Sequence, residues 1–474
     1  MSFYHHAASL PHRFRLVLSS FLQHDGLPFS EALDETHIAQ VFDDEQAMFA
    51  QEEDAIYTPA ITLWAFLSQL LHKDEQRSCT AAVARVITLL VALGKKPCSE
   101  DTGAYCRARA RLSEPVLERL TCETAQRCET QLQSEWLWRG RHVYLVDGTT
   151  VSMPDTPKNQ AVYPQPATQK EGIGFPIARM VVLLSLGSAM VCGMALGPYA
   201  GKETGETALL RQLFGRLDEG DVLLADRYYG SYFMLALLQE LGVDFVVRLH
   251  QLRTADFRRG RRLGRGDHLV RWQRPVKPDW MDQDTYERMP KSIEVREVKV
   301  HVNQPGFRTE SLLVVTTLVD AETVTKDDVA ELYHQRWLVE LDIRAIKCSL
   351  GMDVLRCKSP EMVRREVWAC LLAYNLIRRA MLQAAARCEL SPRQLSFTAA
   401  MQKVAACLGI VPLSDDGLVV SIIEVHLSGL AHHEVGHRPD RVEPRAIKRR
   451  PKPHALLTIP RHQAQAKLRN TLSP

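Results

Sequence analysis

Seven apolar segments between residues 141 and 250 follow one another in an order that few folds can satisfy. Three strand-like runs come first, followed by a helix, a strand, a second helix and a final strand. The segments are 141–154, two runs within 175–200 separated by Leu186-Gly187-Ser188, then 205–217, 221–230, 231–242 and 244–250. This order predicts an α/β sheet that begins antiparallel and continues parallel.

The composition limits the class of protein. The 474 residues are 46% hydrophobic and 24% charged, as in globular proteins, and this length predicts about two to four structural units. No stretch approaches the roughly 18 consecutive apolar residues of a membrane span, and no signal-peptide cleavage site follows the amino terminus. The 11 cysteines contain no C-x-x-C pair, which favours reduced thiols in a cytosolic chain. We therefore exclude a membrane, secreted or fibrous protein.

Charge is separated into blocks, although the net charge is only +3. Residues 31–54 contain nine acidic residues and no Lys or Arg. Residues 253–277 contain nine basic and two acidic residues, and residues 438–469 contain ten basic and two acidic residues. A solvated loop or tail explains either basic block alone, but two such blocks favour a polyanionic partner.

The pattern along the chain predicts five regions. Residues 1–120 form a helical amino-terminal region, which is either a DNA-binding unit or an inert helical cap. Within it, Thr58-Pro59 is the expected start of a helical stretch that Gly94 ends. The two parts of an α/β core, 140–250 and 311–390, flank a β-rich insertion at 251–310. Residues 391–474 form a helical region with a basic tail.

The segment 328–350 is predicted to be one helix with a narrow ionic stripe. At about 100° per residue, with Tyr333 at 0°, Arg336, Glu340 and Lys347 fall near 300°, 340° and 320°. A mostly apolar helix with this stripe is expected to be buried on most sides and to present the stripe to a cleft. Ion pairs on the helix surface explain the stripe equally well, because Arg336 and Glu340 are four residues apart.

Two aspartates add to this stripe. Asp147 and Asp226 are each expected to end a hydrophobic strand at a turn, where open α/β sheets place ligand-binding groups. Neighbouring strands lie about 4.8 Å apart, so both carboxylates can bridge one metal ion. With Glu340 from a helix packed across the sheet, three oxygen ligands suit Mg²⁺ or Mn²⁺, and two such ions about 4 Å apart serve attack on a phosphodiester. Either aspartate alone is more often a turn residue, so the prediction depends on the whole set.

The spacing of Tyr333, Arg336, Glu340 and Lys347 resembles the Y-R-E-K pattern of a group of bacterial insertion-sequence transposases of the DDE class. VDGTT at 146–150 and ADRYYGSY at 225–232 resemble the blocks around that group's two aspartates. The insertion also lies between the second aspartate and the glutamate, as it does in this group. TPAITLWAFLSQLL at 58–71 and PRAIKRRPKPHALL at 444–457 are similar to stretches common in these proteins, so the resemblance covers most of the chain.

The resemblance implies a ribonuclease-H-like mixed sheet and a cut-and-paste DNA transposase that cleaves and joins the ends of its own insertion sequence. Asp147, Asp226 and Glu340 would be the catalytic residues and would bind two Mg²⁺ ions, with Mn²⁺ as a substitute. Tyr333, Arg336 and Lys347 would bind phosphates of the end DNA beside the cut.

The resemblance also implies the partners. These are double-stranded DNA of the terminal inverted repeats and of the target, and a second copy of the chain on DNA. Relatives in this group pass through a DNA hairpin. No membrane and no nucleotide cofactor are expected, and the expected location is the cytoplasm, at the nucleoid.

Two other functions stay open. A domesticated or inactive descendant would bind inverted repeats without cutting, and a plain metal-dependent nuclease would cut without regard to them. The intact carboxylates and ionic stripe speak against the first, and the long insertion and basic tail speak against the second. Within the insertion, Trp272 or Trp280 either stacks on a flipped base, as a Trp does in relatives, or belongs to the core, which is the favoured interpretation.

Overall fold

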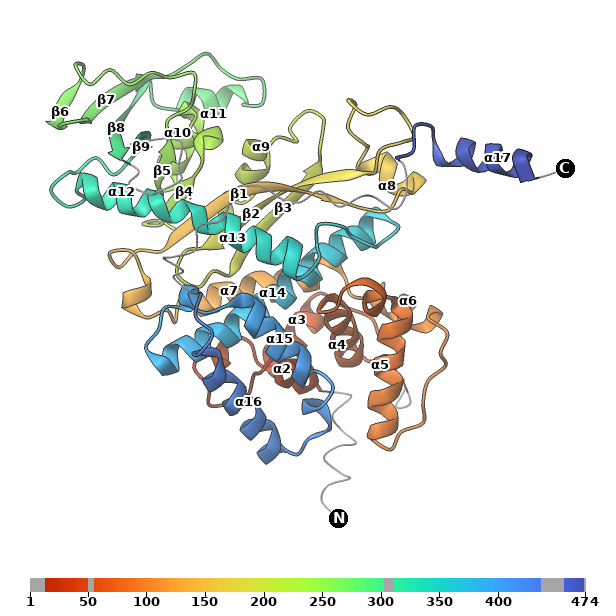
Figure 1. The fold of residues 1–474 in the computed structure, drawn as a ribbon. Helices are drawn as coiled ribbons and strands as arrows, with labels where there is room; N and C mark the ends of the chain where they lie inside the picture. Colours follow the sequence, from red (N-terminus) through yellow and green to blue (C-terminus); the bar gives the residue numbers. More distant parts are fainter. Residues whose placement is uncertain (1–12, 50–54, 302–310, 436–455, 473–474) are drawn as a thin grey trace, which may run out of the picture.

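A nine-stranded mixed sheet runs across the molecule above a thick layer of helices (Figure 1). The computed structural model describes residues 13–49, 55–301, 311–435 and 456–472. The strand order is β3-β2-β1-β4-β5-β9-β8-β7-β6. The strands are β1 Val143–Ser152, β2 Ile177–Ser185, β3 Val191–Pro198, β4 Val222–Ala225, β5 Asp244–Arg248, β6 Arg261–Gly264, β7 Asp267–Gln273, β8 Ser292–His301 and β9 Ser311–Thr316.

The first five strands confirm the predicted sheet. Strands β1, β2 and β3 pair antiparallel, whereas β4 pairs parallel with β1 and β5 pairs parallel with β4. These pairings give a mixed sheet that begins antiparallel and continues parallel, as predicted. The predicted hairpin turn joins β2 to β3, and the strands beside it are buried almost throughout. Continuous apolar runs therefore form strands that are covered on both faces.

The remaining strands extend the same sheet. Strand β9 pairs antiparallel with β5, and β8, β7 and β6 follow, each antiparallel to its neighbour. Short β6 forms the outer edge, with Arg261 and Arg262 exposed. The predicted β-rich segment is thus continuous with the core sheet. The division of the chain into five regions remains a prediction.

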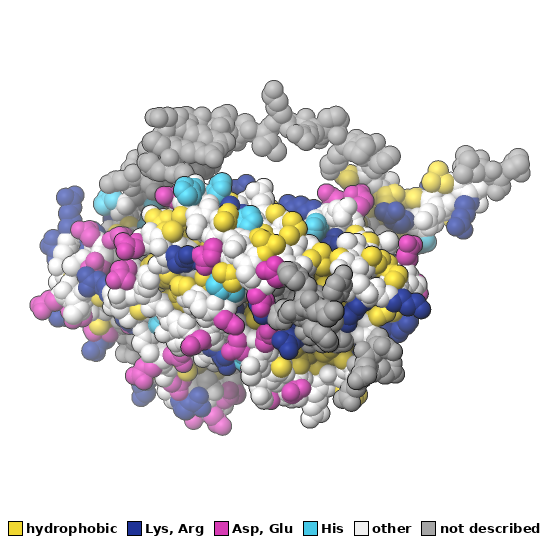
Figure 2. Space-filling model, turned by 90° about the horizontal axis from the view of Figure 1, so that it is seen from below, with side chains coloured by type: hydrophobic (Ala, Val, Ile, Leu, Met, Phe, Trp, Pro, Cys, Tyr) yellow, Lys and Arg dark blue, Asp and Glu magenta, His cyan; other side chains and the backbone are white. Residues whose placement is uncertain are grey.

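The helical layer below the sheet combines helices of residues 15–129 with helices of residues 360–430, around α14 (Figure 1). Its helices are α2 Arg15–Ser20, α3 Glu35–Asp44, α4 Pro59–Leu70, α5 Cys79–Ala92, α6 Gly103–Arg109, α7 Glu114–Glu129, α14 Pro360–Cys388, α15 Phe397–Cys407 and α16 Asp416–Leu430. Thr58 Oγ1 accepts from the backbone N–H of Ile61 at 3.2 Å, which confirms the predicted helix start. Seen from below, Lys and Arg are interspersed with Asp and Glu on this layer (Figure 2).

Shorter helices lie around the sheet, at α8 Pro157–Val162, α9 Glu206–Arg211, α10 Tyr232–Glu240 and α11 Gln283–Arg288, and α17 Arg461–Leu472 extends to one side. Residues 436–455, which hold most of the predicted basic tail, lie outside the described residues. Each of the 11 cysteines is a free thiol. Among the helices of the described ranges, none has both the length and the apolar character needed to cross a bilayer.

The predicted helix at 328–350 is helical throughout, but its hydrogen bonding changes twice. It consists of α12 Lys326–His334, a 3₁₀ turn Gln335–Trp337, α13 Leu338–Arg344 and a π-helical turn Ala345–Ser349. It is also less buried than predicted, because Trp337 is 50% and Leu341 is 42% exposed. Such changes within a helix are frequent at functional sites and alter the angles expected for an ideal helix.

Candidate active site

Asp147 lies within β1, not at its end as the sequence analysis predicted. Strand β1 continues to Ser152 because residues after Asp147 stay paired with the long neighbouring strand β2, up to Ser152 opposite Ile177. The parallel pairing with β4 does stop near Asp147, since its last pair is Leu145 with Leu224. The aspartate is therefore at the point where β1 runs beyond its parallel neighbour.

Asp226 directly follows β4 and caps the next turn. Its Oδ1 accepts from the backbone N–H of Tyr228 at 2.7 Å, at the start of the 3₁₀ turn Arg227–Tyr229. Continuing the register of Leu145 and Leu224 by two residues brings Asp147 and Asp226 to corresponding positions of neighbouring strands. Such positions are about 4.8 Å apart. The structure thus brings together the two predicted aspartates.

The surroundings of Asp147 disfavour its charged form. Burial, together with the nearby charges of Asp226 and Glu206, raises the pKa of Asp147 to about 6, against the lowering effects of the Gly148 N–H and of Arg336. The Gly148 N–H donates to Asp147 Oδ1 at 2.8 Å. Like charges that are close together are stabilised by a cation, so this environment suits a positive ligand.

Glu340 reaches this area from α13, which packs against β1. Its Oε1 accepts from Arg336 Nη2 at 2.7 Å. Arg336 in turn acts electrostatically on Asp147, so the Arg336–Glu340 pair lies near this strand carboxylate. The stripe was explained either as ion pairs on the helix surface or as charged residues that face the site. Each explanation holds in part, because Arg336 and Glu340 form an ion pair on the helix and this pair lies near the aspartates.

Lys347 is fixed to the strand that carries Asp147. Its Nζ donates to Thr149 Oγ1 at 3.0 Å and to the carbonyl oxygen of Thr150 at 2.8 Å. The lysine belongs to the π-helical turn, and its side chain is half-buried. It therefore connects the end of the helical segment to β1, two to three residues beyond Asp147.

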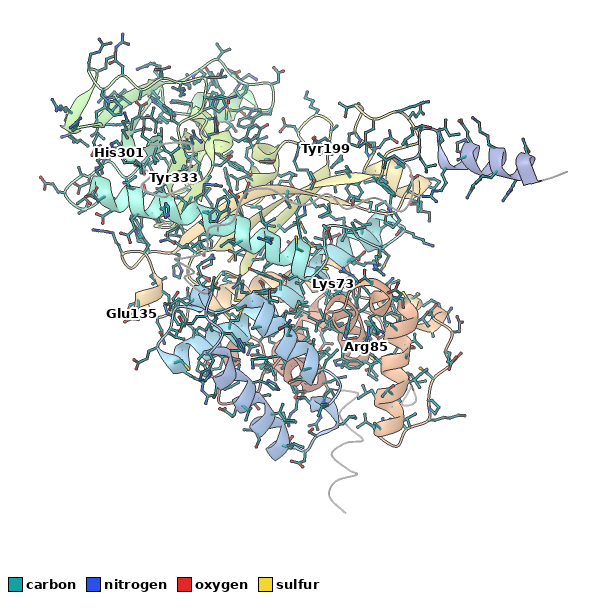
Figure 3. The ribbon with its side chains drawn as sticks, viewed as in Figure 1. Lys73, Arg85, Glu135, Tyr199, His301 and Tyr333 are labelled. Atoms are coloured by element: carbon teal, nitrogen blue, oxygen red, sulfur yellow. The ribbon has the colours of Figure 1, made fainter. Side chains whose placement is uncertain are left out.

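Tyr333 is buried on α12, beside the strands (Figure 3). Burial raises the pKa of its hydroxyl to about 12, while the positive charges of Arg336 and Arg248 act in the opposite direction. The negative charge of Asp226 also acts on it. The six residues predicted from the sequence, Tyr333, Arg336, Glu340, Lys347, Asp147 and Asp226, thus gather around one end of β4.

The opposite side of α13 carries an anchor that the sequence analysis missed. Asp342 is 1% exposed and accepts from Arg378 Nη2 at 2.7 Å and from Arg393 Nη1 at 3.0 Å. Arg378 belongs to α14, and Arg393 also donates to the Ser185 carbonyl at the end of β2. These bonds fix the orientation of α13. A buried acid among apolar positions of a helix is the signal that could have revealed it.

The carboxyl end of the same segment is held by the amino-terminal region. Lys73 Nζ donates to the carbonyl of Cys348 at 2.6 Å, and Arg77 Nη1 donates to that of Leu350 at 2.6 Å. Figure 3 shows Lys73 close to this end of the segment. Cations at the carboxyl end of a helix satisfy its free carbonyl groups and favour its dipole. The position of Glu340 is thereby linked to residues 73–77.

Glu206, at the start of α9, also lies among the predicted residues. Burial raises the pKa of Glu206, and the charge of Asp226 raises it further, while Arg179 lowers it. The sequence analysis predicted this helix but gave Glu206 no role. An acid in the first turn of a helix is common for reasons of helix stability, so the sequence offers no specific signal.

The donor set suits a hard divalent cation, although it is not preassembled. In the described part of the chain, no three His, Cys, Asp or Glu side chains are already grouped to hold a metal. Glu340 is turned to Arg336, and three carboxylates at one point repel each other until a cation balances them. Carboxylate oxygens are the ligands that Mg²⁺ and Mn²⁺ prefer, so the residues present fit such ions.

The two insertion tryptophans both have structural contacts. Trp272 is buried, its Nε1 donates to Glu297 Oε1 at 3.0 Å, and Arg253 lies over its ring at 3.8 Å. Trp280 is half-buried, with Arg211 over its ring at 3.8 Å. The interpretation of Trp272 as a core residue is therefore confirmed.

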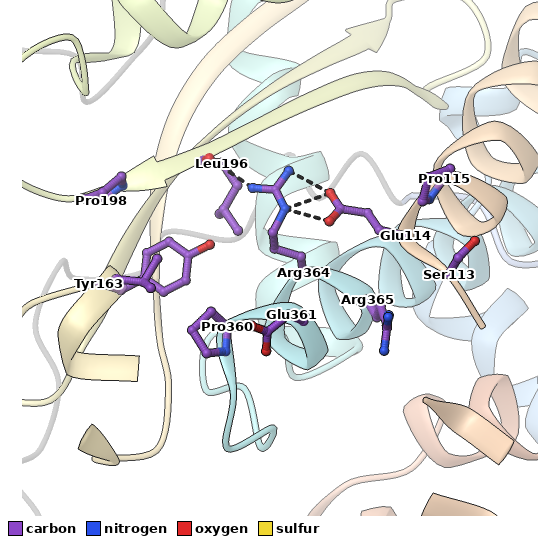
Figure 4. A pocket seen from close by; sticks show the side chains of 11 residues that line it. Ser113, Glu114, Pro115, Tyr163, Leu196, Pro198, Pro360, Glu361, Arg364 and Arg365 are labelled. Carbon is purple, nitrogen blue, oxygen red and sulfur yellow. Dashed lines mark hydrogen bonds and ion pairs between the residues drawn. The ribbon is translucent and has the colours of Figure 1, made fainter. Parts of the chain in front are cut away.

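A separate cavity of about 500 Å³ lies between α7, α14 and the end of β3 (Figure 4). Its Arg364 is engaged by Glu114, with Nε 2.7 Å from each carboxylate oxygen, and by the Leu196 carbonyl. Trp368 Nε1 donates to the same glutamate at 3.2 Å. These bonds connect α7 to α14 and do not involve the predicted site residues.

Known proteins resemble this chain over the region just described. The family model of the "Transposase DDE domain" matches residues 138–376, half of the chain, a range that contains the six predicted residues. Transposase InsG for insertion sequence element IS4 of Escherichia coli (strain K12) is 27% identical over 351 residues, which cover 73% of this chain and 76% of that protein. The transposase for insertion sequence element IS421 of Escherichia coli is 38% identical over 66 residues, 14% of this chain and 18% of that protein.

Among solved structures, the cryo-EM structure of the piggyBac transposase synaptic complex with hairpin DNA aligns with a TM-score of 0.43 at 10% identity. The alignment covers 88% of this chain and 85% of that chain.

Proposed function

This chain belongs to the bacterial insertion-sequence transposases with a DDE domain, and on that basis we propose that it cleaves and joins the ends of its own insertion sequence at Asp147, Asp226 and Glu340. It is a DDE-type DNA transposase, and such enzymes generally use divalent metal ions. The observation that supports this site best is the convergence of Asp147, Asp226 and the Arg336–Glu340 pair at one end of β4.

The three carboxylates would hold two Mg²⁺ ions, for which Mn²⁺ can substitute. Bound ions of this kind polarise the attacking oxygen and neutralise charge at the phosphodiester. Asp147 and Asp226 hold their carboxylates on neighbouring strands, so their spacing is set by the sheet. Glu340 must release Arg336 to join them, and the freed guanidinium is then available for a DNA phosphate.

The remaining residues of the pattern would position DNA. Arg336 is half-buried beside the carboxylates and suits a phosphate next to the cut. Lys347 and the buried Tyr333 would support that contact from β1 and α12. These roles, and membership of the Y-R-E-K group, are part of the proposal.

The edge of the sheet offers a second contact with DNA. Arg258 and Arg259 have side chains 91% and 84% exposed, just before β6, and Arg261, Arg262 and Arg265 are also exposed. Exposed arginines along an edge strand suit the phosphate backbone of flanking or target DNA. Recognition of the terminal repeats by residues 1–120, a homodimer on DNA and a hairpin route complete the proposal.

A plasmid cleavage assay tests the function. A supercoiled plasmid carrying the DNA that flanks the gene is incubated with purified protein and Mg²⁺, and breaks are mapped for wild type, Asp147→Ala and Asp226→Ala. We expect breaks at paired inverted repeats with wild type and none with either variant.

Each other result has a defined meaning. Binding to the repeats without any break would support a domesticated DNA-binding protein. Breaks scattered without regard to the repeats would support a plain nuclease. Repeat-specific breaks that persist in Asp147→Ala would show that the site is assigned wrongly.

A further inference from the structure

Glu206 lies directly on the backbone beside Asp147. A Cβ atom added to Gly148 would be 2.3 Å from Cδ of Glu206 and 2.5 Å from its Oε1, closer than any real Cβ contact. Residue 148 therefore has to be glycine for the glutamate to occupy this place. The first residue of α9 thus reaches over β1 at the residue that follows the first predicted aspartate.

A second contact ties Glu206 to the other aspartate. Tyr229 Oη donates to Glu206 Oε2 at 3.3 Å, and Tyr229 is completely buried in the turn that Asp226 caps. Among the described residues Glu206 forms no ion pair; Arg179 acts on it only at a distance and donates to the Thr204 carbonyl. A half-buried carboxylate beside two others is unfavourable unless a positive group balances it.

Glu206 and Glu340 approach the aspartates from opposite faces of the sheet. Val143 and Leu145 of β1 belong to the core that includes α14 and Val339 of α13. The alternate residues Tyr144 and Val146 belong to the other core, with Leu209 and Leu210 of α9. Because side chains alternate along a strand, α13 covers one face and α9 the other. The two glutamates therefore flank Asp147 and Asp226.

We propose that Glu206 is a fourth metal-binding carboxylate, which would reach from the α9 face of the sheet to a divalent cation held by Asp147 and Asp226. This inference rests on the proposed function. Glu340 would approach the same aspartates from the α13 face. A site with a glutamate on each face supplies both cations with hard oxygen ligands, which the three predicted carboxylates alone have to share.

Binding of Mn²⁺ to the full-length protein, measured by the electron paramagnetic resonance of free Mn²⁺, tests this role. The variant is Glu206→Gln, because the amide oxygen still accepts from Tyr229 Oη but is a weaker ligand for a hard cation. The matched control is Glu203→Gln, which removes a nearby exposed carboxylate paired with Arg211. Two further variants, Asp147→Asn and Asp226→Asn, show whether the two aspartates themselves bind Mn²⁺.

We expect Glu206→Gln to weaken Mn²⁺ binding by about tenfold or more, with the control unchanged. In EDTA its melting temperature should equal or exceed that of wild type, because a repelling charge is removed. A glutamate with only a structural role would instead lower the melting temperature and leave Mn²⁺ affinity unchanged.

The aspartate variants separate the two possible failures. Wild-type affinity in Glu206→Gln, with weaker binding in Asp147→Asn and Asp226→Asn, would overturn the role of Glu206 and leave the proposed site intact. Wild-type affinity in all three variants would show that the proposed metal site is wrong, and it would also overturn the metal-binding role of Glu206.

Discussion

Each side of α13 carries a carboxylate paired with arginine, but the two ion pairs have different roles. Glu340, on one side, is 36% exposed and is held by a single arginine four residues away. Asp342, on the other, is buried and is held by arginines from α14 and from the segment after it. A buried pair is costly to break, whereas an exposed one exchanges partners readily. The inner side therefore fixes the helix, and the outer side remains available for chemistry.

The two ends of β4 show the same contrast. Asp221, just before the strand, is 5% exposed and accepts from the backbone N–H of Asp218 at 2.8 Å. Asp226, just after it, lies near Asp147, Glu206 and the positive residues of the helical segment. In both pairs, the carboxylate that is almost fully buried with its hydrogen-bond partners is structural. The more exposed carboxylate, which lies among the predicted site residues, is the candidate for metal binding.

Glu340→Ala should have the largest effect on activity and almost none on stability. Repeat-specific cleavage should fall at least about a thousandfold, equivalent to about 4 kcal/mol, because a metal ligand is lost. The free energy of unfolding should change by only about 0.5 kcal/mol, since an i,i+4 pair is lost. Cleavage of labelled end DNA and urea denaturation measure the two effects. Cleavage at the wild-type rate would remove Glu340 from the site.

Asp342→Ala should reverse this pattern. The change leaves Arg378 and Arg393 without their carboxylate in a buried place, and the free energy of unfolding should fall by about 3–5 kcal/mol. Urea denaturation followed by circular dichroism measures it. Glu331→Ala, at an exposed position on α12, is the control and should be nearly neutral. If Asp342→Ala is as stable as Glu340→Ala, the two sides of the helix do not differ as described.

Local patterns predicted much of this molecule. The apolar runs of β1 to β5 and the capping residue Thr58 are local signals, so the order of elements along the chain, the antiparallel and parallel pairing and the helix start at Thr58 followed from the sequence. The length of β1 beyond Asp147 did not, because it depends on pairing with β2, which is distant along the chain. The π turn that places Lys347 beside Thr149 likewise depends on tertiary packing.

The two missed acids illustrate the same limit. Asp342 differs from Glu340 only in the side of the helix on which it falls, and its burial depends on arginines that follow it by 36 and 51 residues. Glu206 reaches the site because α9 packs across a glycine of another strand. Neither arrangement has a periodic signature, so the structure was needed to find them.

The pH dependence of stability should reveal the burial of Asp221 at the start of β4. Burial raises the pKa of Asp221 to about 6 from its ordinary value of 3.8. Between these values the folded chain keeps a proton that the unfolded chain releases, so the free energy of unfolding falls as pH rises and levels off above pH 6. Asp221→Asn should remove a part of this fall on the order of 2 kcal/mol. Urea denaturation in EDTA across pH 4–7 measures it, and a difference from wild type that is constant with pH would contradict it.

Lys347→Met should give a modest change in stability and shows whether the segment's last charged residue is structural, DNA-binding or both. Loss of the bonds to Thr149 and Thr150 should lower the free energy of unfolding by about 1 kcal/mol. If Lys347 also contacts a phosphate, the slope of the logarithm of end-DNA affinity against that of salt concentration should decrease by about one. Fluorescence anisotropy across a salt series measures this slope, with a duplex of scrambled repeat as the control. A stability loss with an unchanged slope would assign Lys347 to the inner, structural set with Asp342.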